Sequence, residues 1–196
     1  MSRLVGKQAP YFEANALVNG EQKKVSLDNF NGKWKVLFFY PLDFTFVCPT
    51  EIIAFSDATK KFNENNCEVI ACSVDSFFSH LAWTQQARSE GGLGTINFPI
   101  LSDINKKIAQ DYDVLIEEEG ISLRGLFLID DKNIIQHATV NNLSVGRNVT
   151  ETLRLLEAYQ FTAKHGEVCP AGWQKGDETM KPNPTGSKDW FKKNAK

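Results

Sequence analysis

The apolar and polar positions of the first third of the chain follow two different periods. Residues 19–20 (Asn-Gly) lie between the segment ALV and the later KVSL, a pattern that predicts a tight β-hairpin near the N-terminus. Residues 33–42 (KWKVLFFYPL) form a nearly continuous apolar run of strand length, typical of a central strand covered on both faces. Apolar side chains then recur at helical spacing over residues 49–65, so we expect a helix that begins at Cys48.

The following segments repeat the order of strand and helix. Residues 67–75 (CEVIACSVD) predict a second buried strand. Residues 76–87 (SFFSHLAWTQQA) predict a helix that Ser76 caps. One side of this helix carries Phe78, Leu81, Ala82 and Gln85. The β-α-β-α order implies parallel pairing of these strands.

A glycine loop (GGLG) separates this part from three further elements. We expect a short strand at residues 98–101 and a capped helix at 103–112. Residues 122–130 and 134–140 flank a turn-like Asp-Lys-Asn sequence and predict an antiparallel hairpin. The residues in register along the capped helix are Ile104, Ile108 and Tyr112.

The C-terminal part predicts one long helix and an arm. Residues 149–165 carry leucines at helical positions and favour a closing helix. Beyond Gly166 this pattern gives way to Gly, Pro, Lys and Asp, which is typical of an arm without periodic structure. The chain is therefore expected to be an α/β protein with a three-layer domain at residues 1–165 and a C-terminal arm at residues 166–196.

Charge and hydropathy exclude several classes of partner. The 196 residues include 22 basic and 24 acidic side chains, which are well interspersed and give a formal net charge of −2. A chain without a basic patch is not expected to bind nucleic acid. No segment approaches the roughly 18 apolar residues of a transmembrane helix, and the first residues lack the apolar core of a secretory signal. We therefore expect a cytoplasmic protein with no membrane partner.

The cysteines and histidines of the chain are few and scattered. Four cysteines without a C-x-x-C pair do not form the disulfide framework of a small secreted domain, and the three histidines are isolated in the sequence. Neither a metal site nor a cofactor is expected. Cys67 and Cys72 are expected to be inert, the histidines to be polar surface or edge residues, and Trp83 to pack on a helix face.

Cys48 is the candidate nucleophile, because it precedes a proline at the expected start of a helix. The unpaired N–H groups and the dipole of a helix N-terminus favour a thiolate there. This effect is worth about 0.3–1 kcal/mol, or up to ~2 kcal/mol where the site is partly buried. A fast cysteine enzyme also needs donors that stabilise the charge developing in its transition state, so a further cation should lie near Cys48.

The segment FFYPLDFTFVCPTE resembles the active-site motif of the peroxiredoxins, in which Pro41, Thr45 and Cys48 match the conserved spacing P-x-x-x-T-x-x-C. The group that it resembles most is the typical 2-Cys group, which includes bacterial alkyl hydroperoxide reductase C. The resemblance continues through GGLG, SLRGLFLID, VGRNV and HGEVCPAGW, in the order of that family. It implies a thioredoxin-like three-layer sandwich with a central mixed β-sheet, an N-terminal hairpin and a C-terminal arm.

The resemblance also implies the function and the roles of the matching residues. A thiol-dependent peroxidase of this kind defends the cell against hydrogen peroxide and organic hydroperoxides. Cys48 would attack the peroxide and become a sulfenic acid, Thr45 would hydrogen-bond the peroxide, and Pro41 would shield the thiol. The arginine that holds the thiolate matches Arg124. The supporting hydrogen-bond network of the family matches Glu51 and Arg147.

Cys169, on the C-terminal arm, matches the family's resolving cysteine. It would form an intersubunit disulfide with Cys48 of a homodimer, which thioredoxin or a flavoprotein disulfide reductase would then reduce. The dimers of the family commonly assemble into rings. Disulfide formation requires Cα atoms about 4.4–6.8 Å apart, so we expect local unfolding at the helix start and in the arm.

Other functions are weighed against this one. A dithiol oxidoreductase of the thioredoxin kind would need a second cysteine where the chain has Glu51, and no hydrolase signature surrounds the histidines. A holdase chaperone role, known for some relatives in large oligomers, is the alternative of a different class. The intact GGLG loop with Trp190-Phe191 in place of the family's Tyr-Phe pair leads us to expect sensitivity to overoxidation.

Overall fold

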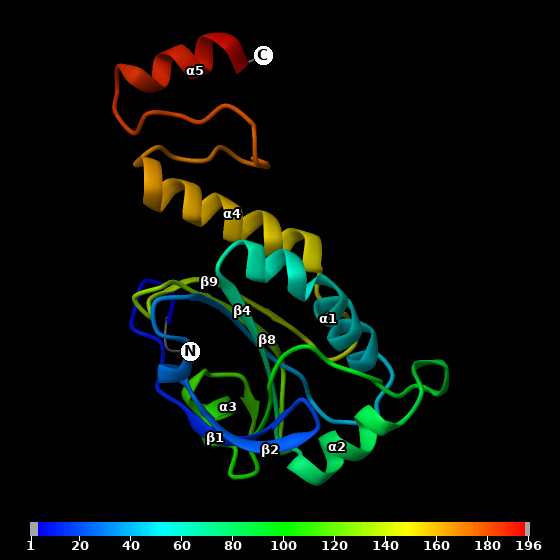
Figure 1. Ribbon diagram of the computed structural model, residues 1–196. Coiled ribbons are helices and arrows are strands. Elements are labelled where there is room, and N and C mark those ends of the chain that lie inside the picture. Colours follow the sequence, from blue (N-terminus) through cyan, green and yellow to red (C-terminus); the bar gives the residue numbers. More distant parts are fainter. Residues whose placement is uncertain (1–3, 195–196) are drawn as a thin grey trace. The chain divides into compact units, whose positions relative to one another are not determined.

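The computed structural model describes residues 4–194 and divides into two compact units, Met1–Val149 and Thr150–Lys196. The first unit contains a seven-stranded sheet, and the second consists of helices and an irregular segment (Figure 1). A domain boundary at residue 165 stays a prediction.

The sheet of the first unit has the strand order β2-β1-β5-β4-β3-β8-β9. Strands β3, β4 and β5 pair in parallel, whereas all other neighbours pair antiparallel, so the sheet is mixed as expected. A separate two-stranded ladder, which the sequence pattern missed, joins β6 (Leu115–Ile116) to β7 (Ile121–Ser122). The strands of the main sheet are β1 (Glu13–Val18), β2 (Glu21–Ser26), β3 (Trp34–Phe39), β4 (Cys67–Ser73), β5 (Ile100–Ser102), β8 (Arg124–Ile129) and β9 (Ile135–Asn141).

The predicted hairpins are both confirmed. The turn between β1 and β2 places Asn19 and Gly20 at φ values of 53° and 81°, the left-handed backbone that a two-residue hairpin turn requires. Asn133, in the turn between β8 and β9, also has a positive φ of 63°. Asparagine and glycine adopt this conformation at low cost, which is why these positions mark turns in the sequence.

Helices cover both faces of the sheet. Phe38 of β3 stacks at 4.7 Å on Phe55 of α1 (Cys48–Glu64), while its neighbour Phe39 points to the opposite face. There the ring of Phe39 lies 5.4 Å from Tyr112 and 5.9 Å from Phe127, next to α3 (Lys107–Asp111). The first unit is thus a three-layer sandwich with α1 and α3 on opposite faces (Figure 1).

The helix α3 is shorter than the predicted segment 103–112. Lys106, directly before its first residue, has a φ of 63°, which breaks the helical backbone. The carboxylate of Asp103 accepts the N–H groups of Ile108 and Ala109 at 3.0 and 2.7 Å and so caps the helix from a preceding turn. Ile104 is 62% exposed, so it does not belong to the apolar face that was expected.

The helix α2 (Phe77–Gln85) is capped by Ser76 as predicted, since the Ser76 hydroxyl accepts the N–H of Ser79 at 3.2 Å. Its buried face, however, carries Phe77, His80 and Trp83, whereas Phe78 is 73% exposed. The expectation that His80 lies at the surface is therefore wrong, and the packing role of Trp83 is confirmed. Both sides of this helix are rich in apolar residues, so periodicity alone did not identify the buried one.

The predicted closing helix, α4 (Val149–His165), starts at the last residue of the first unit and continues as the first element of the second. An irregular segment follows, with an isolated antiparallel bridge between Val168 and Met180. The arm then ends in a further helix, α5 (Gly186–Asn194), so only part of it lacks periodic structure. Among residues 4–194, no helix combines the length and apolar character needed to cross a membrane.

Candidate active site

Cys48 is the first residue of α1 and is fully buried. The preceding residue, Val47, gives no side-chain cap, and Pro49 follows directly, as the sequence pattern predicted for a helix start at the cysteine. Pro49 has no N–H, and the N–H groups of Thr50 and Glu51 donate to the carbonyl oxygen of Val47, so the helix acts on the sulfur through its dipole. This arrangement favours negative charge at the position of Cys48.

Arg124 supplies the cation that the position of Cys48 called for. Its Nη1 donates to Cys48 Sγ at 3.3 Å and to Glu51 Oε2 at 2.7 Å, and its Nε donates to the carbonyl oxygen of Leu143 at 2.7 Å. The side chain of Arg124 is only 3% exposed, so its charge acts on the sulfur with little screening by water.

The fold explains how two residues 76 positions apart meet. Strand β8 runs antiparallel to β3, and Leu126 pairs with Phe38. Arg124, two residues before Leu126, therefore lies at the end of β3 from which the chain leads to Cys48. A parallel register would place Arg124 at the opposite edge of the sheet.

Glu51 joins the two buried arginines of the site. Its Oε1 accepts the backbone N–H and Nε–H of Arg147, both at 2.7 Å, and its Oε2 accepts Nη2 of Arg147 at 3.0 Å in addition to Arg124. Two guanidinium groups and one carboxylate leave one positive charge uncompensated. A thiolate at Cys48 balances that charge, so the cluster is built for an anion at the sulfur.

Arg147 is held at five points besides its backbone. Nη1 donates to the carbonyl oxygens of Phe39 and Gly125 at 2.8 and 2.6 Å, Nε and Nη2 donate to Glu51, and the guanidinium carbon lies 5.2 Å from the ring centre of Phe38. Burial lowers the pKa of Arg147, while Glu51 acts in the opposite direction. The hydrogen bonds thus hold Arg147 as a cation in a place where water cannot solvate it.

Gly146 is a part of the site that the pattern of the sequence did not reveal. A Cβ atom at this position would lie 3.3 Å from Glu51 Cγ and 3.3 Å from Val47 Cγ1, which is closer than ordinary packing. The absence of a side chain lets the segment that carries Arg147 approach α1. A glycine before an arginine gives no sequence signal of such a contact.

Thr45 and Pro41 lie in the turn between β3 and α1. Pro41 is buried, and Thr45 is half-buried with its hydroxyl donating to the carbonyl oxygen of Leu42 at 3.0 Å. The contacts given above join Cys48, Arg124, Glu51 and Arg147 directly. They do not include Thr45 or Pro41, which lie in the turn that leads to Cys48 and whose place in the site stays a prediction.

Cys169 belongs to the second unit and is half-buried. Its thiol donates to the carbonyl oxygen of Ala158 at 3.6 Å and lies 3.7 Å from the Thr162 hydroxyl. All four cysteines are unpaired. Cys169, the expected resolving cysteine, is therefore a reduced thiol that lies against α4.

Cys67 and Cys72 are buried within β4. Burial raises the pKa of both thiols, and the carboxylate of Asp103 raises that of Cys72 further. Lys35 lowers the pKa of Cys67 without offsetting the effect of burial. These thiols stay protonated, which supports the expectation that they are inert.

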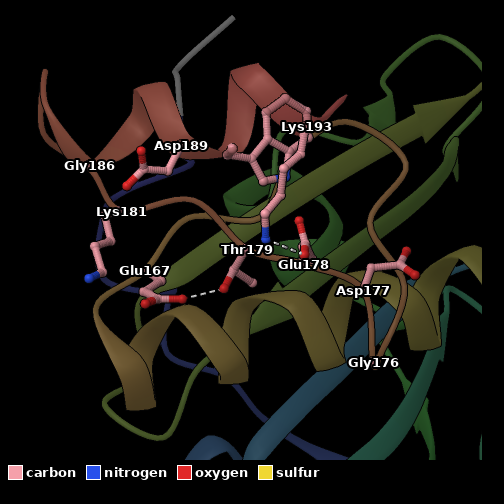
Figure 2. Close-up of a pocket in the computed structure, with 10 residues that line it drawn as sticks. Glu167, Gly176, Asp177, Glu178, Thr179, Lys181, Gly186, Asp189 and Lys193 are labelled. Carbon is pink, nitrogen blue, oxygen red and sulfur yellow. Dashed lines mark hydrogen bonds and ion pairs between the residues drawn. The ribbon is translucent and has the colours of Figure 1, made fainter. Parts of the chain in front are cut away.

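A cavity of about 460 Å³ lies in the second unit between the segment 176–181 and α5 (Figure 2). Its lining is mostly charged and includes an ion pair of 3.0 Å between Lys193 and Glu178 and a hydrogen bond from Thr179 to Glu167. None of its lining residues belongs to the Cys48 cluster. Within residues 4–194, no group of three His, Cys, Asp or Glu side chains could hold a metal ion.

The mixed sheet, the helix that starts at a buried cysteine and the guanidinium that contacts its sulfur define a cysteine-dependent oxidoreductase of the peroxiredoxin class. The chain belongs to the AhpC/TSA family, whose profile matches residues 5–138. A second profile, the C-terminal domain of 1-Cys peroxiredoxin, matches residues 158–193. The resemblance to the peroxiredoxins is thereby confirmed.

Named relatives and solved structures agree with this assignment. The chain is 60% identical to the mitochondrial thioredoxin-dependent peroxide reductase of Mus musculus, over 96% of this chain and 74% of that protein. It is 57% identical to peroxiredoxin-2 of Bos taurus, over 96% and 95% of the two chains. The crystal structure of reduced Plasmodium vivax 2-Cys peroxiredoxin superposes with a TM-score of 0.95 at 48% identity, covering 97% of this chain and 100% of that one. The predicted thioredoxin-like fold is confirmed, and the chain is an enzyme of this class.

Proposed function

We propose that this protein reduces hydrogen peroxide and organic hydroperoxides through the thiolate of Cys48. The observation that carries the proposal is the contact of 3.3 Å between Arg124 Nη1 and Cys48 Sγ, inside a buried cluster with one uncompensated positive charge. The N–H that this nitrogen directs at the sulfur can be shared with a peroxide oxygen that approaches the sulfur. Positive charge at this point stabilises the negative oxygens of the transition state.

The reaction transfers one oxygen atom. The sulfur of the Cys48 thiolate attacks the terminal oxygen of the peroxide in line with the O–O bond, so an S–O bond forms and the O–O bond breaks. The other oxygen leaves as alkoxide or hydroxide and takes up a proton to give alcohol or water. Sulfur is oxidised by two electrons, the peroxide is reduced by two electrons, and Cys48 becomes a sulfenic acid.

The remaining residues of the site act on geometry and access. We assign Thr45 to hydrogen-bond the peroxide and Pro41 to shield the thiol from solvent. Glu51 holds both guanidinium groups in a fixed orientation, and Arg147 adds its charge and ties α1 to the neighbouring strands. The positive charges are thus in place before the substrate binds, which avoids reorganisation during the reaction.

Cys169 of the partner subunit is proposed to resolve the sulfenic acid. Its thiol displaces the sulfenic oxygen as water and forms a disulfide with Cys48. Cys48 is fully buried and the thiol of Cys169 is bonded to Ala158, so both segments must open before the Cα atoms reach disulfide distance. Local unfolding of the first turn of α1 and of the arm meets this requirement.

Thioredoxin is the proposed reductant of this disulfide, and a flavoprotein disulfide reductase is the alternative. The name of the Mus musculus relative, a thioredoxin-dependent peroxide reductase, supports the first choice. The location of the protein in the cytoplasm stays a prediction, because that relative is named as mitochondrial.

A homodimer that assembles into a ring is proposed as the oligomeric state. Apolar side chains are exposed on the turn before α1 and on α2, with Phe46 95%, Phe78 73% and Phe44 54% exposed. Aromatic side chains are enriched at protein–protein interfaces, so these exposed rings support association between subunits. Analytical ultracentrifugation of the reduced protein, compared with a Phe46→Ser variant, tests this assembly.

Peroxide consumption by cysteine variants tests the proposed chemistry. Cys48→Ser should abolish consumption, whereas Cys169→Ser should still reduce one equivalent of peroxide per subunit and then stop. Non-reducing electrophoresis should show a covalent dimer for the wild type and none for either variant. A Cys48→Ser protein that retains turnover, or a Cys169→Ser protein that still forms the covalent dimer, contradicts the proposal.

A further inference from the structure

The arm that carries Cys169 is bonded to α4 at two points. One is the sulfur itself, whose contacts with Ala158 and Thr162 are 3.6 and 3.7 Å long. The other lies further along the arm, where Arg154 Nη1 donates to the carbonyl oxygen of Trp173 at 2.9 Å. A hydrogen bond from an ionised donor is shorter and roughly twice as strong as one between neutral groups. The second point is therefore the stronger of the two.

Glu151, one turn earlier on α4, fixes the orientation of the Arg154 guanidinium group. Its Oε2 accepts Nε–H of Arg154 at 2.6 Å and its Oε1 accepts Nη2–H at 2.7 Å, which makes a bidentate pair. The rigid fork of arginine then leaves Nη1 as the donor that faces the arm. The two side chains are 25% and 50% exposed, so the pair adds little to stability but directs Arg154 at Trp173.

Trp173 anchors the part of the arm that follows Cys169. This residue is 3% exposed, and its ring centre lies 5.3 Å from that of Phe161 on α4. Its indole N–H donates to the carbonyl oxygen of Asp177 at 3.1 Å, and its backbone N–H donates to that of Pro170 at 3.1 Å. Because a hydrogen-bonded turn joins Pro170 to Trp173, Cys169 cannot move far from α4 while that turn and Trp173 stay in place.

We propose that Arg154 is a positioning residue for the resolving step: its bond to Trp173 holds the Cys169 segment against α4 and sets how often the thiol is released. The inference rests on the proposed function, in which the Cys169 thiol displaces the sulfenic oxygen of Cys48 as water. Arg154 acts through the backbone of Trp173 and takes no part in the attack on the peroxide.

The release of Cys169 competes with a second oxidation of Cys48. In that oxidation a second peroxide transfers one oxygen atom to the sulfenic sulfur, so an S–O bond forms and the O–O bond breaks. The other peroxide oxygen leaves as alcohol or water, and the product is a sulfinic acid. This route gains when the sulfenic acid waits longer for the second thiol. A firm bond at Trp173 therefore favours the sulfinic acid at a given peroxide concentration.

Substitution of Arg154 tests the hold on the arm. Arg154→Met removes the donor to Trp173 and should raise the rate of covalent-dimer formation after one equivalent of hydrogen peroxide about tenfold. Arg154→Lys keeps a charged donor without the fork and should raise this rate by less than about threefold. Rapid quenching followed by non-reducing electrophoresis measures both rates. A wild-type rate in Arg154→Met overturns the proposal.

Glu157→Gln is the matched control, because Glu157 and Lys175 also join α4 to the arm, at 3.5 Å. The side chain of Lys175 is 72% exposed, and an exposed ion pair of this kind contributes little. Glu157→Gln should therefore form the covalent dimer within about twofold of the wild-type rate. Equal acceleration in Glu157→Gln and Arg154→Met overturns the assignment to Arg154.

Two other roles of Arg154 predict different results. A general loss of structure would change the stopped-flow rate of Cys48 with hydrogen peroxide, whereas this first step should proceed at the wild-type rate in Arg154→Met. The charge of Cys169 raises the pKa of Arg154, less than the hydrogen bond to Glu151 does. If Arg154 used this attraction to activate the thiol, Arg154→Met would form the dimer more slowly than the wild type. A changed first step or a slower dimer overturns the proposal.

Mass spectrometry of Cys48 over a peroxide series gives an independent measurement. Arg154→Met should need about tenfold more hydrogen peroxide for half-conversion to sulfinic acid, and an equal or smaller dose overturns the proposal. The proposed function fails separately, if Cys48→Ser retains turnover or Cys169→Ser still forms the covalent dimer. If those two variants behave as proposed while Arg154→Met resolves at the wild-type rate, the proposed function stands and the role of Arg154 is wrong.

Discussion

The two cysteines proposed to act in turn occupy environments of opposite kind. Cys48 is fully buried at a helix start, with Arg124 at 3.3 Å and a network of charged hydrogen bonds behind it. Cys169 is half-buried, and its sulfur is hydrogen-bonded to two neutral groups, the carbonyl of Ala158 and the hydroxyl of Thr162. The first site is organised before the reaction, whereas the second holds a thiol that must leave its resting place.

This difference follows from what each step demands. Cleavage of an O–O bond develops charge on oxygen, so the protein must hold positive groups in place in advance. Disulfide formation demands that two sulfurs meet in a narrow geometry, so the second thiol must be able to move. A rigid cluster for one cysteine and weak neutral contacts for the other serve these two needs.

The largest effect that separates the two environments is expected from the arginines. Arg124→Met removes the cation beside Cys48 and should lower the stopped-flow rate with hydrogen peroxide by about 10³-fold, the upper range for loss of one transition-state donor. Arg154 of the second unit is the matched control, because it bonds Glu151 and the carbonyl oxygen of Trp173. Arg154→Met should react with peroxide like the wild type. Comparable losses of rate in the Arg124 and Arg154 variants would mean that the charge beside Cys48 does not act on the reaction.

A smaller effect is expected when a carboxylate of either unit is replaced, and it is measured as a change in the free energy of unfolding. Glu51→Gln removes the carboxylate that bridges the two buried guanidinium groups, so that one positive charge is left uncompensated even with a thiolate at Cys48, and it should lower the free energy of unfolding by about 3 kcal/mol. Glu151→Gln breaks the ion pair with Arg154, in which the two side chains are 50% and 25% exposed, and should cost less than about 1 kcal/mol. Urea unfolding of the reduced proteins measures both values, and equal losses would contradict the contrast between the units.

The smallest expected effect is the loss of stability at high pH that is caused by Cys67 and Cys72, the buried thiols without a guanidinium beside them. Burial raises the pKa of Cys72 in the folded state, while an unfolded thiol titrates near pH 8.5. Above that pH the unfolded chain loses a proton that the folded chain keeps, so stability should fall by about 1.4 kcal/mol per pH unit for such a thiol. Well below about pH 8.5 the thiol is protonated in both states, so the ionisation of Cys72 should not change the free energy of unfolding there.

Urea unfolding between about pH 7 and 9.5 with a reductant present measures this slope. Cys72→Ala should make it shallower, and Cys67→Ala, at a thiol whose pKa is also raised by burial, should do the same. An unchanged slope in both variants would mean that the two thiols ionise as easily in the folded state as in the unfolded chain.

Most elements of the fold were predictable from local patterns. The hairpin at Asn19-Gly20, the continuous apolar strand β3 and the helix after Cys48 all have strong signals within a few residues. The predictions failed where a long-range contact decides the outcome. The start of α3 depends on the carboxylate of Asp103, and the buried face of α2 depends on the partners of His80.

The site was predictable in part because its residues match a motif. Cys48, Thr45 and Pro41 lie within eight positions of one another, so the sequence placed them in one turn. Arg124 and Arg147 were assigned by resemblance, and their roles stay proposals that the contacts support. The contacts of Gly146 were not predicted, and His80 was wrongly expected at the surface, because neither a glycine before an arginine nor a histidine on an apolar helix has a local signal of its contacts. Sensitivity to overoxidation and holdase activity stay predictions.

The sequence by itself determined that a thiol stands between a buried strand and the first turn of a helix. It also determined the hairpins, the chain order of the main-sheet strands and of helices α1 to α4, and the need for a cation, because these follow from spacing and from the small size of the helix-terminus effect. Only the tertiary structure decided which guanidinium contacts the sulfur, that Glu51 links two arginines, and that His80 is buried against Asp43. Such contacts depend on strand register and on burial, and both arise only when distant segments pack together.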